Sequence, residues 1–159
     1  MASPLKVGVI SDTHGLVRPE AIDALRGADV IVHAGDVGGP HVLQELGELA
    51  PVIAVRGNMD VEPWATALPE RRRLELGGAT VLLLHDRAMV RASPAAEGIE
   101  VVVFGHSHQP LAERADGVLW FNPGSAGPQR FRLPVSLGFF EIEEGRVRHR
   151  LVPIQPARP

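Results

Sequence analysis

The chain has 159 residues, of which 45% are hydrophobic, and this combination is typical of one compact domain. We therefore expect a single domain over residues 1–159, with a frayed proline-rich tail at 153–159. The 16 basic and 19 acidic residues give a net charge of −3, which argues against a disordered polyelectrolyte and against a broadly basic nucleic-acid binder. No stable nucleic-acid binding is expected.

Cysteine is absent from the sequence. This excludes a disulfide framework, thiolate zinc sites, iron–sulfur clusters and a cysteine nucleophile, so any metal ligands must be nitrogen and oxygen atoms. The first ten residues run directly into an apolar segment without a basic region and cleavage site, and no stretch approaches 18 uninterrupted apolar residues. We expect no membrane segment and a cytoplasmic protein.

The first half of the chain alternates short β-branched runs with segments of helical periodicity. Strands are predicted at residues 6–11, 30–34 and 52–55, and helices at residues 19–25 and 41–49. Such an alternation predicts neighbouring parallel strands joined by right-handed crossovers.

The second half predicts mostly antiparallel strands. A hairpin is expected from residues 73–76 and 80–84, a buried strand at 100–104, and two further hairpins at 111–114 with 118–121 and at 137–142 with 147–152. The fold class is therefore α/β, with two packed mixed sheets and helices outside.

Polar residues of metal-ligand type follow five of these strands directly. Side chains just beyond the carboxyl ends of strands converge in one crevice of an α/β fold, so residues distant in sequence are expected to meet there. The residues are Asp12, His14, Asp36, Asn58, His85, His106 and His108.

Each of these residues also has a structural interpretation. An Asp or Asn at a strand end commonly satisfies backbone amides in a turn, and His85 fits a hydrogen-bonded core imidazole. Their joint occurrence at the same end of successive strands favours a metal site. Seven oxygen and imidazole ligands are too many for one four-coordinate ion and suit two ions that share a carboxylate. Such donors suit Mn²⁺, Ni²⁺, Fe²⁺ or Zn²⁺, among which Mn²⁺ is favoured, and they disfavour Ca²⁺.

In order, Asp12-x-His14, Gly35-Asp36, Gly57-Asn58, His85 and Gly105-His106-x-His108 resemble the signature of the calcineurin-like metallophosphoesterases. The small size and the segment Asn122-Pro123-Gly124-Ser125 narrow the resemblance to the compact single-domain bacterial and archaeal phosphodiesterases, whose fold is similar to that of the retromer scaffold subunit. The resemblance runs from about Val7 to Phe140. It implies a four-layer αββα sandwich, in agreement with the strand predictions.

The resemblance also implies roles for individual residues. Asp12, His14 and His108 would hold one divalent ion, Asn58, His85 and His106 the other, and Asp36 would bridge both. A hydroxide between the metals would attack phosphorus in line with the leaving oxygen, with Asp36, Asn58 and His106 as the catalytic residues. Asn58 would also contact the substrate. Arg130 is a further candidate for that contact, from its position after the loop 122–127 and not from the resemblance.

The sequence departs from the family pattern at two positions. Met59 stands where many larger relatives have a histidine, and it cannot donate a proton, so slow turnover of poor leaving groups is expected. Asp86 stands where the family usually has glycine, and it would orient His85, protonate a leaving group or, as we favour, point to solvent. Asp60 is expected to cap a turn rather than act as an acid.

Four further features of the sequence allow structural or functional interpretations. The loop 122–127 fits either ligand orientation and anion binding or a simple strand ending, and Arg130 either a phosphate contact or a solvated surface residue. The run Arg71-Arg72-Arg73 is expected to form a solvated edge, and His33 to pack in the core.

The sequence thus predicts a divalent-metal-dependent phosphodiesterase acting on small or nucleotide-like phosphoesters. Alternatives are a phosphomonoesterase, a dinucleotide-polyphosphate hydrolase, or a protein-binding scaffold like the retromer subunit. The resemblance also makes a homodimer plausible as a partner state.

Overall fold

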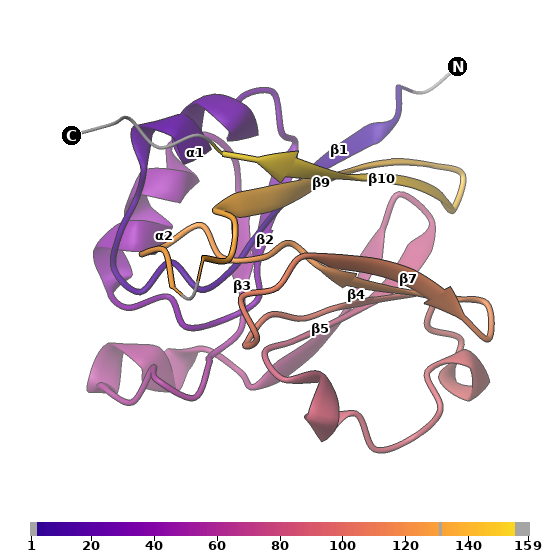
Figure 1. Ribbon diagram of the computed structural model, residues 1–159. Coiled ribbons are helices and arrows are strands. Elements are labelled where there is room, and N and C mark those ends of the chain that lie inside the picture. Colours follow the sequence, from indigo (N-terminus) through magenta and orange to yellow (C-terminus); the bar gives the residue numbers. More distant parts are fainter. Residues whose placement is uncertain (1–2, 131, 155–159) are drawn as a thin grey trace.

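The structure is a computed structural model that describes residues 3–130 and 132–154. Two five-stranded sheets form its centre (Figure 1). The strands of the first sheet are β1 (Leu5–Ile10), β2 (Val30–His33), β3 (Val52–Ala54), β9 (Ser136–Glu143) and β10 (Arg146–Pro153). Those of the second sheet are β4 (Arg71–Leu76), β5 (Ala79–Leu84), β6 (Val101–Val103), β7 (Leu111–Ala115) and β8 (Val118–Asn122).

Both sheets are mixed, as the sequence predicts. The first has the order β10-β9-β1-β2-β3, in which β1, β2 and β3 are parallel, β9 is antiparallel to β1, and β10 is antiparallel to β9. The second has the order β4-β5-β6-β8-β7, with β5, β6 and β8 parallel between antiparallel edge strands. Each sheet therefore has three neighbouring parallel strands, whose carboxyl ends lie at one rim.

Two α-helices cover the outer face of the first sheet, α1 (Pro19–Leu25) and α2 (Pro40–Gly47). Both begin with proline, whose missing N–H costs nothing in the first turn. Their buried residues Leu25, Val42 and Leu46 pack on Ile10 and Ile31 of the sheet. Because these apolar residues recur at helical spacing, one face of each helix is buried.

The outer face of the second sheet is covered differently. Two short 3₁₀ turns lie in the segment between β5 and β6, η2 (Arg87–Met89) and η3 (Ala95–Glu97), whereas a third, η1 (Pro63–Ala67), has Trp64 packed with the apolar cluster of the first sheet. Val90 and Ile99, which follow η2 and η3, pack on the outward residues Leu82, Val102 and Phe104. The predicted four-layer αββα sandwich is confirmed, with 3₁₀ turns and loops in place of α-helices in the fourth layer.

The main core lies between the two sheets. Strand side chains alternate in direction, so Val81 and Leu83 face the first sheet while their neighbours face outward. Phe121 of β8 meets Phe140 of β9 edge to face, with 4.8 Å between ring centroids. This pair joins the sheets directly behind the rim where the candidate residues lie.

Two predicted boundaries differ from the structure. Strand β4 begins at Arg71, so the arginine run forms part of an edge strand, and its three side chains are exposed as expected. The predicted tail does not begin at 153, because Pro153 pairs with Ser136 and Ile154 is buried and donates its amide to the Val135 carbonyl. The remaining residues of that tail, 155–159, lie outside the described part of the chain. No helix in the described part is long and apolar enough to cross a bilayer.

Replacing Phe121 by alanine should lower the free energy of unfolding by about 3–5 kcal/mol, because the truncation leaves a cavity between the sheets. Chemical denaturation measures the difference. Glu113→Ala on the neighbouring strand β7 is the control, since Glu113 is exposed and its loss should change stability by less than about 0.5 kcal/mol. Equal effects of the two substitutions would contradict the placement of Phe121 in the inter-sheet core.

Candidate metal centre

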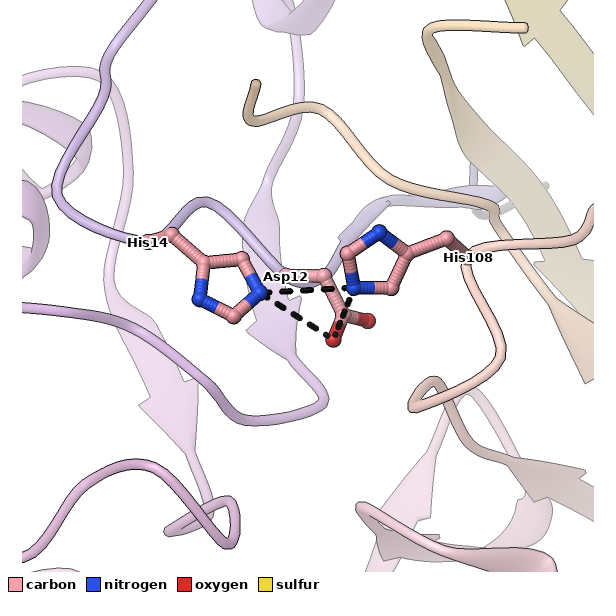
Figure 2. A group of neighbouring side chains, drawn as sticks. All are labelled: Asp12, His14 and His108. Atoms are coloured by element: carbon pink, nitrogen blue, oxygen red, sulfur yellow. Dashed lines mark hydrogen bonds and ion pairs between the residues drawn. The ribbon is translucent and has the colours of Figure 1, made fainter. Parts of the chain in front are cut away.

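The residues predicted from the strand ends lie together at one rim of the two sheets. Asp12 and His14 follow β1, Asp36 follows β2, and His108 comes from the loop after β6. Figure 2 shows Asp12, His14 and His108 pointing toward one another. Nε2 of His108 lies 3.3 Å from Nε2 of His14 and 3.3 Å from Oδ1 of Asp12. The predicted convergence is confirmed.

A second group adjoins the first through Asp12. Oδ2 of Asp36 lies 3.3 Å from Nε2 of His85, and Oδ1 of Asp12 lies 3.9 Å from that same nitrogen. Oδ2 of Asp36 is also 3.7 Å from Nε2 of His14. Asp36 therefore faces one histidine of each group.

Asn58 and His106 occupy the open side of the centre. Nδ1 of His106 lies 3.3 Å from Oδ1 of Asn58, and its ring stands edge to face with that of His85 at 5.2 Å between centroids. Both side chains are exposed, whereas Asp12, Asp36, His85 and His108 are buried. A molecule arriving from solvent therefore meets Asn58 and His106 first.

Each of the two carboxylates accepts hydrogen bonds from protein groups with one oxygen and points the other oxygen into the centre. Oδ2 of Asp12 accepts hydrogen bonds from the Ser11 hydroxyl at 2.6 Å and the His106 amide at 3.1 Å. Oδ1 of Asp36 accepts from the Met59 amide at 2.9 Å. Among the described residues, the buried side-chain polar atoms that lack a hydrogen-bond partner are Oδ1 of Asp12 and Nε2 of His85. Buried polar atoms without a partner are costly, and a cation would satisfy both of these.

The tautomer of His85 suits a cation as well. Its Nδ1–H donates to the carbonyl of Ala34 at 2.8 Å, so the neutral ring presents the lone pair of Nε2 to the centre. A metal-bound histidine typically uses its second nitrogen in this way to fix the ring. The donor set of carboxylate oxygens and imidazole nitrogens thus fits divalent transition metals.

In the centre, the carboxylates and the imidazoles shift one another's pKa. Burial raises the pKa of Asp36, but the nearby His85 imidazole and the hydrogen bond from the Met59 amide outweigh it, and the pKa is lowered overall. Burial lowers the pKa of His85, but Asp36 and Asp12 outweigh it, and the pKa is raised. The carboxylates are therefore ionised at neutral pH, as metal binding requires, and protons compete with a cation at His85.

Five of the seven candidate residues have left-handed backbone conformations. The φ angles of Asp12, His14, Asp36, His106 and His108 lie between 47° and 74°. Side chains other than glycine adopt this region at an energetic cost, and such residues concentrate at functional sites. The surrounding packing thus holds the loops where the side chains face one another.

Close backbone approach also explains two glycines of the predicted motifs. A Cβ at Gly57 would lie 2.2 Å from the amide nitrogen and Oδ1 of Asp36, and one at Gly105 would lie 2.5 Å from Oδ2 of Asp12. Any side chain at either position would displace a carboxylate of the centre.

Comparison with known proteins agrees with this arrangement. The family model described as "Calcineurin-like phosphoesterase superfamily domain" matches residues 5–145. The chain belongs to this superfamily. Phosphodiesterase YfcE of Escherichia coli is 32% identical over 86% of this chain and 88% of its own length. A probable metallophosphoesterase of Methanothermobacter thermautotrophicus is 38% identical over 80% of this chain and 81% of its own length.

Solved structures show the same fold. The structure of zinc-bound Vps29 from Entamoeba histolytica has a TM-score of 0.74 at 21% identity, covering 94% of this chain and 99% of that chain. An archaeal phosphodiesterase has a TM-score of 0.76 at 24% identity, covering 92% and 99%. The predicted enzyme class, a metal-dependent phosphoester hydrolase, is confirmed at the level of the family.

The structure resolves the alternatives for two residues near the motifs. Asp60 caps turns, because its buried carboxylate accepts amide hydrogen bonds from Val37, Gly38 and Gly57 at 3.0 Å each. Asp86 does not simply point to solvent as favoured. Its Oδ1 accepts from the Ala88 amide at 2.9 Å, and its Oδ2 lies 3.9 Å from Nε2 of His106. It therefore faces His106 rather than His85.

The loop 122–127 supports the centre from behind. The Asn122 side chain donates to the carbonyl of Gly105 at 3.1 Å, and the Ser125 hydroxyl donates to the carbonyl of Asp12 at 3.0 Å. Its polar groups thus hold the loops that carry the candidate residues. Arg130 is exposed beyond this loop, and together with burial its charge lowers the pKa of His14 against the opposing effect of the carboxylates.

His33 has a structural role that the sequence does not reveal. Its Nδ1 accepts the Gly35 amide at 3.1 Å, so the neutral ring carries its proton on Nε2, which lies 3.0 Å from the Thr13 hydroxyl. Thr13 in turn donates to the Val37 carbonyl at 2.8 Å. This fully buried chain ties the loop after β1 to the loop after β2, beneath Asp12 and Asp36.

His33 should make stability depend on pH. Burial lowers its pKa to about 4. The unfolded chain takes up this proton near pH 6.5, so stability falls as the pH drops from 6.5 toward 4. We expect His33→Gln to be less stable than the parent protein at pH 7, with the difference shrinking by about 3 kcal/mol at pH 4. Denaturation in the presence of a chelator measures it, and a pH-independent difference would contradict the neutral buried imidazole.

Proposed function

We propose that this protein is a divalent-metal-dependent phosphodiesterase that hydrolyses small or nucleotide-like phosphoesters. The observation that carries the proposal is the pair of buried lone pairs without a partner, on Oδ1 of Asp12 and Nε2 of His85, at a rim lined by further imidazoles. Membership of the calcineurin-like phosphoesterase superfamily supports the same reaction class.

The two groups of side chains suggest how a pair of ions would be held. One ion would be held by Asp12, His14 and His108, whose ligand atoms lie within 4.8 Å of one another. The other would be held by His85, His106 and Asn58, with Asp36 bridging because its Oδ2 faces His14 as well as His85. Mn²⁺ is the proposed metal, with Ni²⁺, Fe²⁺ or Zn²⁺ as alternatives.

Divalent ions bound here would lower the pKa of a bound water and neutralise charge on the phosphoester oxygens. Binding and orienting the substrate would depend on protein side chains. Asn58 and His106 stand at the exposed side, where their polar atoms can contact and orient the phosphate. Two divalent cations would outweigh the charges of Asp12 and Asp36, so an anionic substrate is attracted locally although the chain is acidic overall.

Arg130 is the proposed second contact to the substrate. The charge of Arg130 contributes to the lowered pKa of His14, which supports a position near that residue. A guanidinium offers two parallel N–H donors to phosphate oxygens. Arg130 would therefore contact the substrate at the His14 side of the centre.

Met59 limits the chemistry available at the leaving group. Its side chain is 63% exposed and carries no proton to donate, and the buried Asp60 is fully used by backbone amides. We therefore expect esters of acidic alcohols to be hydrolysed faster than esters of poor leaving groups.

Two alternatives are separated by simple measurements. A phosphomonoesterase or dinucleotide-polyphosphate hydrolase would use the same metal centre, and relative rates on mono- and diesters decide between them. A protein-binding scaffold rests on the likeness to Vps29, which at 21% identity is a likeness of fold. The predicted homodimer and the cytoplasmic location stay predictions.

Hydrolysis of bis(p-nitrophenyl) phosphate by the Mn²⁺-loaded protein tests the proposal. His106→Ala and Asn58→Ala should each reduce kcat/KM by at least about a hundredfold, because each removes a proposed metal ligand that also contacts the substrate. His149→Ala is the matched control, since this histidine is exposed on β10 in the C-terminal hairpin and matches no proposed ligand position. It should change the rate by less than about twofold.

Two results would contradict the proposal. One is full activity in both the His106 and the Asn58 variant while thermal melts show that they are folded. The other is no hydrolysis of aryl phosphodiesters by the parent protein with any of the four metals.

A further inference from the structure

A cavity of about 310 Å³ opens directly beside the metal centre. Asn58 and His85 line both the cavity and the centre, so the two spaces are continuous. The wall of the cavity also includes Arg56 after β3, Arg71 at the start of β4 and Arg91 after η2. Its volume lies in the range of pockets that hold small ligands.

The three arginines differ in how they are held. The guanidinium of Arg56 lies 3.1 Å from the Glu70 carboxylate, and its side chain is 30% exposed. Within the described residues, the side chains of Arg71 and Arg91 form no hydrogen bond, ion pair or ring contact. Both are exposed, so their guanidinium groups are available to a ligand in the cavity.

The carboxylates near the cavity do not cancel this charge. Glu70 is bound to Arg56, and Asp86 is held by the Ala88 amide with its second oxygen toward His106. Arg71 and Arg91 thus leave the wall with an excess of positive charge. The metal centre would attract the phosphate under attack, so this additional charge is suited to a second anionic group.

Met89 adds an apolar surface at the same cavity. Its side chain is 49% exposed, although methionine is commonly buried. A thioether makes favourable contacts with aromatic rings. A nucleotide-like ligand in the cavity would therefore find arginines for its phosphate and the Met89 side chain for its heteroaromatic base.

We propose that this cavity binds a second phosphate group of the substrate, an inference that rests on the proposed function. The preferred substrates are then nucleotide-like phosphodiesters that carry an additional phosphate. Arginine favours phosphate because its planar guanidinium matches two phosphate oxygens at once. Arg71 and Arg91 supply the main contacts, with Arg56 held ready by Glu70.

Two substrates that differ only in the second phosphate test the proposal. They are thymidine 5′-(p-nitrophenyl phosphate) and the same ester with a 3′-phosphate. In both, water adds to the 5′ phosphorus, the bond to the aryl oxygen breaks and p-nitrophenolate leaves. With Mn²⁺-loaded protein we expect the 3′-phosphorylated ester to have a kcat/KM about tenfold higher, mainly through a lower KM.

The double variant Arg71→Gln/Arg91→Gln should bring the ratio of the two kcat/KM values close to one. The matched control is Arg72→Gln, because Arg72 is the next residue of β4, points to the other face of the strand and does not line the cavity. It should keep the ratio of the parent protein. Since the guanidinium groups are exposed, the ratio should also fall as the salt concentration rises.

A binding measurement keeps this inference separate from the proposed function. Calorimetry compares thymidine 3′,5′-bisphosphate with thymidine 5′-monophosphate on the Mn²⁺-loaded protein. Tighter binding of the bisphosphate that disappears in the double variant supports the cavity even if neither ester is hydrolysed, in which case only the proposed function fails. Hydrolysis of both esters with a ratio near one, or a preference that survives in the double variant, would overturn the inference alone.

Discussion

The carboxylates of Asp12 and Asp36 each bind the backbone with one oxygen and keep the other for the centre. This division fixes the rest of the site, because the tied oxygens hold the loops after β6 and β3 in place. The free oxygens then face the imidazoles of His108 and His85 at 3.3 Å. Negative charge and nitrogen lone pairs are thus concentrated in a buried place, where a bound cation satisfies both.

Burying these charges and polar atoms together costs free energy, and the surrounding fold holds them in place. Five of the candidate residues have left-handed backbone, and Asp60 and His33 accept hydrogen bonds from backbone amides of the adjoining loops. Glycine at positions 57 and 105 lets these backbones come close enough to touch the carboxylates. The large apolar core behind the rim, with Phe121 and Phe140 in contact across the sheets, supplies the rigidity. The candidate ligand atoms are therefore held in position by the fold itself.

The sequence alone predicts the strands, the mixed sheets and the seven candidate residues, because each motif follows a buried strand whose apolar pattern is clear. It does not predict the 3₁₀ turns over the second sheet, since these lack helical periodicity. Nor does it reveal that His33 links the loops after β1 and β2, or that Asp86 faces His106, because both depend on contacts across the fold. The cavity beside the centre joins Arg56, Arg71 and Arg91 from three separate segments, a placement that only tertiary structure shows.

The most direct test of the central claim is anomalous diffraction from crystals grown with Mn²⁺. The account predicts two metal peaks per chain. One should lie beside Oδ1 of Asp12 and Nε2 of His108, and the other beside Nε2 of His85 and Oδ2 of Asp36. A centre with a single peak or with none, at full Mn²⁺ saturation, would contradict the account.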